Sequence, residues 1–197
     1  MTKKVYWIQQ SVDDEGERPD VVTYGDAKYK TGEGYNAFVK NCRVAAGDAG
    51  FPPEKWFIPE LRATQPGKTP IEAWDYYACA TFGVFSPKAL QVLTPYVGDR
   101  FQPLEARLEG HLYYCLHCRS RTDCLDAGAS QIDYLAGDQD KIMWIDRHVF
   151  NKDVLTDPMI FAIPKAPFRL YCTDSLPEIC KKVGLRGFDF ELVDSAR

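Results

Sequence analysis

The sequence predicts an α+β fold of mostly antiparallel strands with a few short helices. Two observations support this class. The chain of 197 residues holds 11 Phe, 11 Tyr and 4 Trp, which are residue types that favour strands. Short apolar runs also recur between glycine and Asp-Pro turns, while few segments show the spacing of an amphipathic helix. With 45% hydrophobic residues, the chain can bury a substantial core.

The N-terminal part has weak signals. Lys4–Gln9 is predicted to be a strand, Val21–Tyr24 a second short strand and Tyr35–Val44 a helix. Phe51–Pro70 contains five prolines, which excludes a regular central strand or helix because proline lacks the backbone N–H. We expect this stretch to be an extended connector held to the body by its aromatic residues, or the divide between two regions.

The signals are sharper from residue 82. Phe82–Phe85 is a predicted strand, Ser86 an N-cap and Pro87 the first helical residue, where a missing N–H costs nothing. Apolar residues then follow at helical spacing until Gly98, and Phe101–Leu108 is the next strand.

The same order of elements returns at the end of the chain. Phe168–Cys172 is a predicted strand, with Thr173 or Asp174 capping a helix over Leu176–Val183, and Phe188–Val193 is the closing strand. An internal repeat of strand-helix-strand units would explain this, and so would two ordinary β-α-β passages. The intervening chain supplies further predicted strands at His111–Cys118, Gln131–Leu135, Ile142–Ile145, His148–Phe150 and Met159–Ile163.

Two regions are expected: residues 1–75 as an N-terminal strand and loop region packed on the body, and residues 76–197 as the main α+β domain. One continuous domain is the alternative. The four tryptophans are expected in the core more readily than at an interface, although the residue is favoured at both.

Net charge limits the kind of partner, and the cysteine count indicates the cell compartment. The net charge of −4 and the pI of about 5.4 argue against a nucleic acid or an anionic membrane as the main partner. Mild acidity is common in cytosolic proteins and is the simpler interpretation, while a basic protein partner is the more specific one. The run Val5–Ile8 is too short for a signal-peptide core, and no segment is apolar for the roughly 20 residues that span a bilayer. Seven cysteines, an odd number, fit a reducing cytoplasm.

One cluster could carry chemistry: His111, Cys115, His117 and Cys118 together resemble a zinc or cysteine-nucleophile site. On an extended strand, however, Cys115 and Cys118 would point to opposite faces. We therefore predict ordinary strand packing, with a small metal- or cysteine-dependent enzyme or module as the alternative. No phosphate-binding loop or dinucleotide fingerprint is present, and no cofactor is predicted.

Acidic residues are concentrated in one predicted loop and one predicted turn. The loop holds the first-loop acids Asp13, Asp14, Glu15 and Glu17, and the turn holds Asp138 and Asp140. Such runs are usually solvated surface. Asp123 and Asp126 are expected to form turns by bonding to nearby backbone.

Many positions between about 82 and 193 resemble a family of bacterial polymorphic-toxin immunity proteins, immunity family eleven, formerly a domain of unknown function. The resemblance rests on Val84-Phe85-Ser86-Pro87, Leu90, Leu93, Phe101-Gln102-Pro103-Leu104, Tyr113-Tyr114, Asp123-Cys124-Leu125-Asp126, Ser130, His148-Val149-Phe150, Phe168-Arg169-Leu170 and Gly184-Leu185-Arg186-Gly187-Phe188-Asp189-Phe190. These positions are strand and turn residues, which define a scaffold and no active site.

The resemblance implies a non-enzymatic protein that binds and neutralises a cognate bacterial toxin, expected to be of the nuclease type, in the cytoplasm of the producing cell. The family supplies no binding residues for this chain. The predicted toxin contacts are therefore chosen by charge and expected exposure, and they are the first-loop acids with Asp138 and Asp140. The sequence leaves the oligomeric state open.

Overall fold

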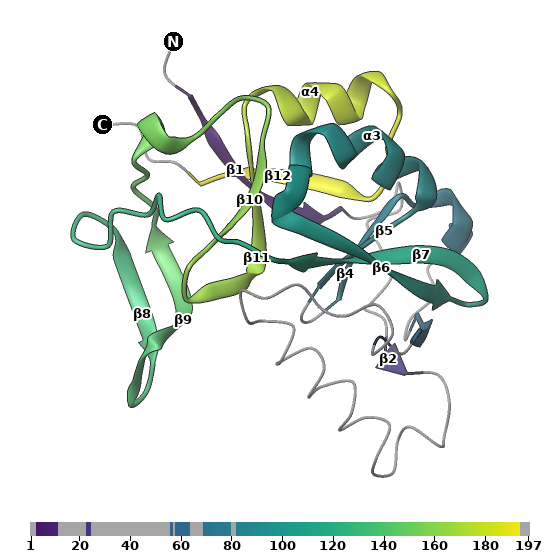
Figure 1. The fold of residues 1–197 in the computed structure, drawn as a ribbon, viewed down its shortest axis with the longest axis horizontal. Coiled ribbons are helices and arrows are strands. Elements are labelled where there is room, and N and C mark those ends of the chain that lie inside the picture. The colour runs from purple at the N-terminus through teal and green to yellow at the C-terminus, as the bar shows by residue number, and fades with distance from the viewer. Residues whose placement is uncertain are drawn as a thin grey trace.

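A computed structural model of the protein describes residues 3–11, 23–24, 56, 58–63, 69–79 and 82–193. It contains three sheets and two α-helices, and the two helices lie together over one side of the molecule (Figure 1). The predicted α+β class is confirmed. The predicted helix at 35–44 and most of the acidic loop lie outside the described residues.

The four-stranded sheet is entirely antiparallel. In spatial order it contains β10 (Ile160–Ile163), β11 (Ala166–Thr173), β1 (Val5–Gln10) and β12 (Phe188–Leu192). The first strand of the chain therefore lies in the middle of a sheet whose other members come from the last forty residues or so. Backbone pairing thus joins the two ends of the described chain.

The six-stranded sheet is antiparallel except where β3 runs parallel to β6. Its spatial order is β2 (Thr23–Tyr24), β3 (Glu60–Arg62), β6 (Phe101–Leu108), β7 (His111–Cys118), β5 (Phe82–Phe85) and β4 (Tyr76–Cys79). The third sheet is a hairpin of β8 (Gln131–Leu135) and β9 (Asp138–Arg147), which projects from the body in Figure 1.

The helices are α3 (Pro87–Val97) and α4 (Ser175–Lys182), and short 3-10 turns lie at η2 (Ile71–Ala73), η3 (Gly98–Arg100) and η4 (Lys152–Val154). The predicted start of α3 is confirmed, because the backbone N–H of Ala89 donates to Ser86 Oγ at 3.0 Å. The predicted end is confirmed too, since Gly98 follows the helix with a φ of +53°.

Three sequence-based expectations were wrong. A short strand, β3, fits between Pro59 and Pro66, because three residues are enough to pair with β2 and β6. His148–Phe150 forms no regular strand: His148 and Phe150 each take part in a β-bridge, and Phe150 is bridged to Leu125. The cap of α4 comes from a distant residue: Asp157 Oδ1 accepts the Ser175 N–H at 3.0 Å, while Asp174 makes no capping bond.

The two strand-helix-strand segments share one topology. β5 and β6 both pair antiparallel with β7, which lies between them, and α3 connects β5 to β6. β11 and β12 likewise flank β1, and α4 connects β11 to β12. Each unit is therefore a split β-α-β arrangement with an antiparallel strand inserted from elsewhere in the chain.

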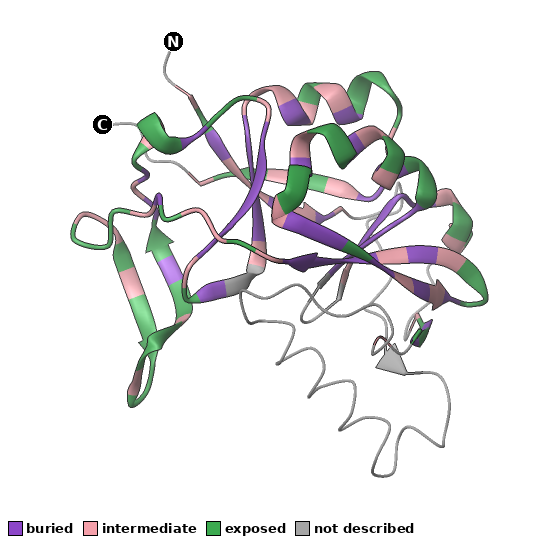
Figure 2. Ribbon diagram, viewed as in Figure 1, coloured by how far each residue is buried: buried purple, intermediate pink, exposed green. Residues whose placement is uncertain are grey.

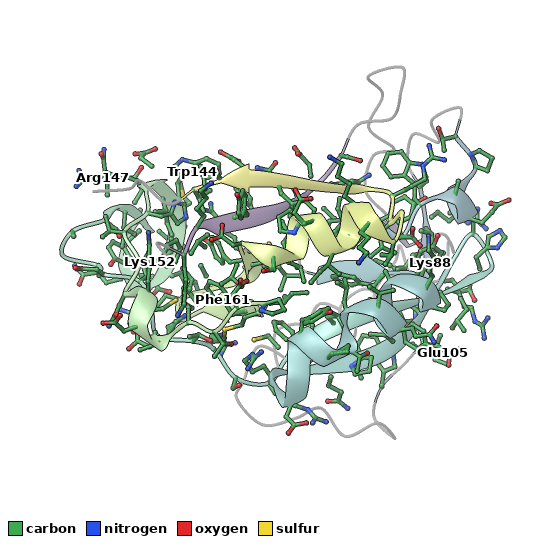
Figure 3. The ribbon with its side chains drawn as sticks, turned by 90° about the horizontal axis from the view of Figure 1, so that it is seen from above. Lys88, Glu105, Trp144, Arg147, Lys152 and Phe161 are labelled. Atoms are coloured by element: carbon green, nitrogen blue, oxygen red, sulfur yellow. The ribbon has the colours of Figure 1, made fainter. Side chains whose placement is uncertain are left out.

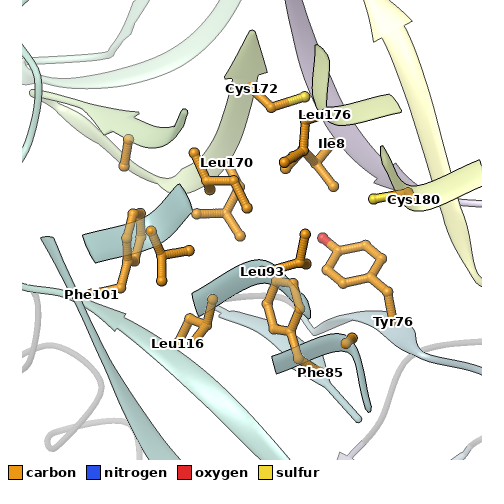
Figure 4. Packing of buried hydrophobic residues seen from close by; sticks show 14 of the residues in the cluster. Ile8, Tyr76, Phe85, Leu93, Phe101, Leu116, Leu170, Cys172, Leu176 and Cys180 are labelled. Atoms are coloured by element: carbon orange, nitrogen blue, oxygen red, sulfur yellow. The ribbon is translucent and has the colours of Figure 1, made fainter. Parts of the chain in front are cut away.

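The main core lies between these two units. Side chains from both helices and both large sheets converge there, and Figure 4 shows them in contact: Ile8, Phe85, Leu93, Phe101, Leu116, Leu170 and Leu176. A second core lies on the other face of the six-stranded sheet, and a third on the other face of the four-stranded sheet. Figure 2 shows the result, with buried central strands and a largely exposed β8–β9 hairpin.

Gly187 allows the last strand to approach β4. Its φ is +92°, and a Cβ atom there would lie 2.4 Å from the Tyr76 carbonyl oxygen. That oxygen belongs to backbone, which cannot move aside as a flexible side chain could. Gly184 shares the positive φ, at +65°, but a Cβ atom on it would meet nothing within 4 Å.

The two glycines therefore form a matched pair for mutation. Gly184→Ala should cost about 1–2 kcal/mol of unfolding free energy, because only the left-handed backbone is penalised. Gly187→Ala should cost roughly 2–5 kcal/mol, since the steric overlap adds the cost of overpacking. Urea unfolding measures both values. Equal losses in the two variants would show that the contact with Tyr76 is not tight.

Candidate binding surface on the β8–β9 hairpin

The structure describes only two of the six acids predicted to bind a partner. The first-loop acids Asp13, Asp14, Glu15 and Glu17 lie outside the described residues. Asp138 and Asp140 lie on β9 next to the hairpin turn.

Asp138 and Asp140 each form an ion pair within the protein. Asp138 Oδ2 lies 2.8 Å from Lys141 Nζ, and Asp140 Oδ1 lies 3.1 Å from Lys165 Nζ. The side-chain hydrogen bond from Lys141 holds the pKa of Asp138 below its usual value. Asp138 also accepts the backbone N–H of Asp140 at 3.0 Å, so it helps to shape the turn.

Apolar side chains on the same hairpin are the feature that sequence reasoning missed. Four of the eight exposed large hydrophobic residues in the described part of the chain lie there: Tyr134, Leu135, Met143 and Trp144. Met143 is 62% exposed and Trp144 46% exposed. Trp144 is therefore a half-exposed surface residue, whereas Trp74 is buried, as expected for a core tryptophan.

Arg169 fastens Trp144 to the body. The guanidinium of Arg169 lies 4.6 Å from the centre of the Trp144 ring and 4.9 Å from that of Trp7 on β1. The two indoles meet edge to face at 5.9 Å. Arg169 Nη2 also donates to the Met143 carbonyl at 3.2 Å. A cation that lies over both rings, together with the contact between the rings, favours one orientation of the half-exposed Trp144 side chain.

Other contacts hold the rest of the hairpin. The N–H of Ile142 donates to the Lys165 carbonyl at 2.9 Å, and Ile145 is buried in the third core. At the base, Ser130 Oγ accepts the Val149 N–H at 3.0 Å and Asp126 Oδ1 accepts the Ala129 N–H at 3.0 Å. This confirms the predicted turn role of Asp126. Figure 3 shows Trp144 and Arg147 at one end of the molecule, far from Lys88 at the other.

A buried histidine lies in the core that supports the hairpin. His148 packs against Phe150 and Tyr171, and its Nε2 lies 3.2 Å from the Tyr171 hydroxyl. Burial, with a smaller effect of the Arg169 charge, lowers the pKa of His148 to about 4. The ring is therefore neutral at neutral pH.

The alternative metal or nucleophile cluster is divided by the sheet. Cys115 lies in the core on one face of β7, and Cys118 lies in the core on the opposite face. His117 is buried, while His111 is exposed and lies 3.7 Å from the Glu72 carboxylate. Among the residues that the structure describes, no three His, Cys, Asp or Glu side chains are grouped as metal ligands.

The fold and this surface form an α+β scaffold with a projecting hairpin that carries exposed aromatic and acidic side chains. Residues 100–195, from the end of η3 past β12, match the model of the Immunity protein family (Imm11). This match confirms the family resemblance over that region, and it supports an immunity role.

A search of curated proteins gave no match. Within the described residues, no helix has the length and apolar character needed to cross a membrane.

Lowering the pH should destabilise the protein through His148. The pKa is depressed in the folded state, so the unfolded chain binds the proton more readily. The stabilising effect is complete above pH 6.5 and is lost as the pH falls through about 4. It amounts to no more than about 3 kcal/mol. Urea unfolding of wild type and His148→Gln across this range measures it. Parallel curves for the two proteins would show that His148 titrates normally.

Cys115→Ser separates packing from metal binding. We expect a loss of about 1–3 kcal/mol of unfolding free energy, because a hydroxyl replaces a buried thiol. Zinc content, measured by elemental analysis of the purified protein, should stay well below one ion per chain. Cys180→Ser, a buried cysteine on α4, is the matched control. One zinc per chain, released by the first substitution and kept by the second, would support the metal alternative.

Proposed function

We propose that this protein is an immunity protein that binds a cognate bacterial toxin and neutralises it in the cytoplasm of the producing cell. We propose further that the toxin is a nuclease-type effector and that the protein acts by binding alone, without catalysis. The observation that carries the proposal is the Imm11 match over residues 100–195.

The net negative charge of the protein supports a basic partner. The net charge is −4, which suits a toxin domain that is basic because it must bind nucleic acid. Stable complexes of this kind bury about 1,200–2,000 Å² and draw specificity from complementary charge. The first-loop acids, Asp138 and Asp140 remain our predicted contacts. The pairing of the last two with lysines suggests that they contribute less than free carboxylates would.

Binding by a rigid scaffold also fits the organisation of the chain. β1 is paired on both sides by strands from the C-terminal part, and Trp56 Nε1 donates to the Glu105 carbonyl on β6 at 2.7 Å. We propose that the N-terminal region, residues 1–75, and the main region, residues 76–197, act as one unit. In that arrangement the toxin would meet loops and a hairpin displayed on a fixed frame.

Affinity capture tests the function. The tagged full-length protein is recovered from its native cells, and bound polypeptides are identified by mass spectrometry. We expect near-stoichiometric recovery of one basic, secretion-linked polypeptide. Co-expressing the terminal domain of that polypeptide with wild-type protein should then restore the growth that the domain alone abolishes.

A growth assay without the immunity candidate, and one with an inactive toxin variant, provide the controls. Failure of the co-expressed protein to restore growth would contradict the proposed function. Recovery of no polypeptide, together with one tightly bound zinc per chain, would favour the metal-dependent alternative at His111, Cys115, His117 and Cys118 instead.

A further inference from the structure

The β8–β9 hairpin presents an unusual surface for a structure of this size. Among the residues that the structure describes, its two strands pair only with each other, and four exposed large hydrophobic side chains lie within them. Exposed aromatic and methionine side chains that are grouped in this way are typical of interaction sites, where they become the buried centre of an interface. Scattered single exposed hydrophobics would need no such explanation.

The Trp144 ring and the backbone at Met143 are held by contacts within the protein. The Arg169 guanidinium lies over both the Trp144 and the Trp7 rings, and the Met143 carbonyl accepts a hydrogen bond from the same guanidinium. Ile145, near the end of β9, is buried in the third core. Side chains that are already ordered lose little conformational entropy on binding, so more of the contact energy appears as affinity.

Acids border the apolar group. Residues 131–147 include four Asp against one Lys and one Arg, which is a net charge of −2. Asp133 lies directly across the ladder from Trp144, and Asp146 is two residues beyond Trp144 on the same strand. Both are exposed, and unlike Asp138 and Asp140 they have no ion-pair partner among the residues that the structure describes.

These observations lead us to propose that the β8–β9 hairpin is the docking site for a basic protein surface, with Met143 and Trp144 at its centre and Asp133 and Asp146 as its charged border. The proposal rests on the proposed function, since the partner it fits is the toxin domain. It adds to the predicted acidic contacts at the turn a set of aromatic and unpaired acidic positions nearer the base of the hairpin.

Binding measurements with paired variants test the proposal. The probe is the toxin domain recovered by affinity capture, purified as a catalytically inactive variant. Met143→Ser removes an apolar contact from a side chain that is largely exposed, so the fold should be kept. We expect its Kd to rise at least about 10-fold, as for an interface hot spot. Val183→Ser, at the exposed end of α4, is the matched control and should leave Kd within about twofold.

Charge reversal tests the acidic border separately. Asp133→Lys with Asp146→Lys should slow association by about 10-fold at low salt and weaken its dependence on ionic strength, because steering by opposite charge is lost. Asp99→Lys on η3 reverses an exposed acid elsewhere and should change association little. Amide hydrogen exchange of residues 131–147 should also slow in the wild-type complex.

The outcomes separate the two proposals. If wild-type protein binds and neutralises the toxin while the hairpin variants match it in Kd and association rate, the docking site is overturned and the immunity function stands. If wild-type protein neutralises nothing, the function fails and the docking proposal fails with it. Thermal unfolding of each variant confirms that a loss of binding does not come from a loss of folding.

Discussion

The Asp75 carboxylate joins three parts of the chain: the start of β4, the beginning of α3 and the loop before β12. Oδ1 accepts the Ser86 hydroxyl at 2.6 Å, Oδ2 accepts the Arg186 N–H at 2.9 Å, and Lys88 Nζ lies 3.5 Å away. Backbone bonds from Asp75 N to the Arg186 carbonyl and from Ser86 N to the Asp75 carbonyl extend the same junction. A buried carboxylate is stable only when it is satisfied in this way, so the start of β4, the cap of α3 and the loop before β12 are fixed together.

This junction links the two split β-α-β units, because Asp75 and Ser86 belong to one side of it and Arg186 to the other. The loop that reaches Asp75 contains Gly187, whose close approach to Tyr76 allows Phe188 to stack on the Tyr76 ring at 4.8 Å. The main core then forms from both units at once, with α3 and α4 contributing side chains to the same cluster. Neither unit buries this core alone, so each unit needs the other to remove its apolar side chains from water.

The packed body provides a frame for the hairpin on which the proposed docking site lies. The hairpin contributes no side chain to the main core. Its contacts with the rest of the protein include those of Arg169, Lys165 and Ile145. A scaffold of this kind keeps its core while exposed positions on loops and hairpins vary with the partner. The family match covers both the scaffold strands β6, β7, β11 and β12 and the hairpin itself. The family match and the proposed docking site therefore lie in the same region of the chain.

Local chemistry in the sequence was enough to predict α3 and the strands on either side of it, because Ser86, Pro87 and Gly98 act on neighbouring backbone. It also predicted the division of Cys115 and Cys118 between opposite faces, since alternation along a strand is a local property. The Asp157 cap of α4, the insertion of β1 between β11 and β12, and the Arg169 clamp on Trp144 depend on residues far apart in the chain. Only the tertiary structure could decide these contacts, because the sequence does not show which distant residues come together. For the same reason the apolar pattern of a strand does not show which apolar side chains remain exposed.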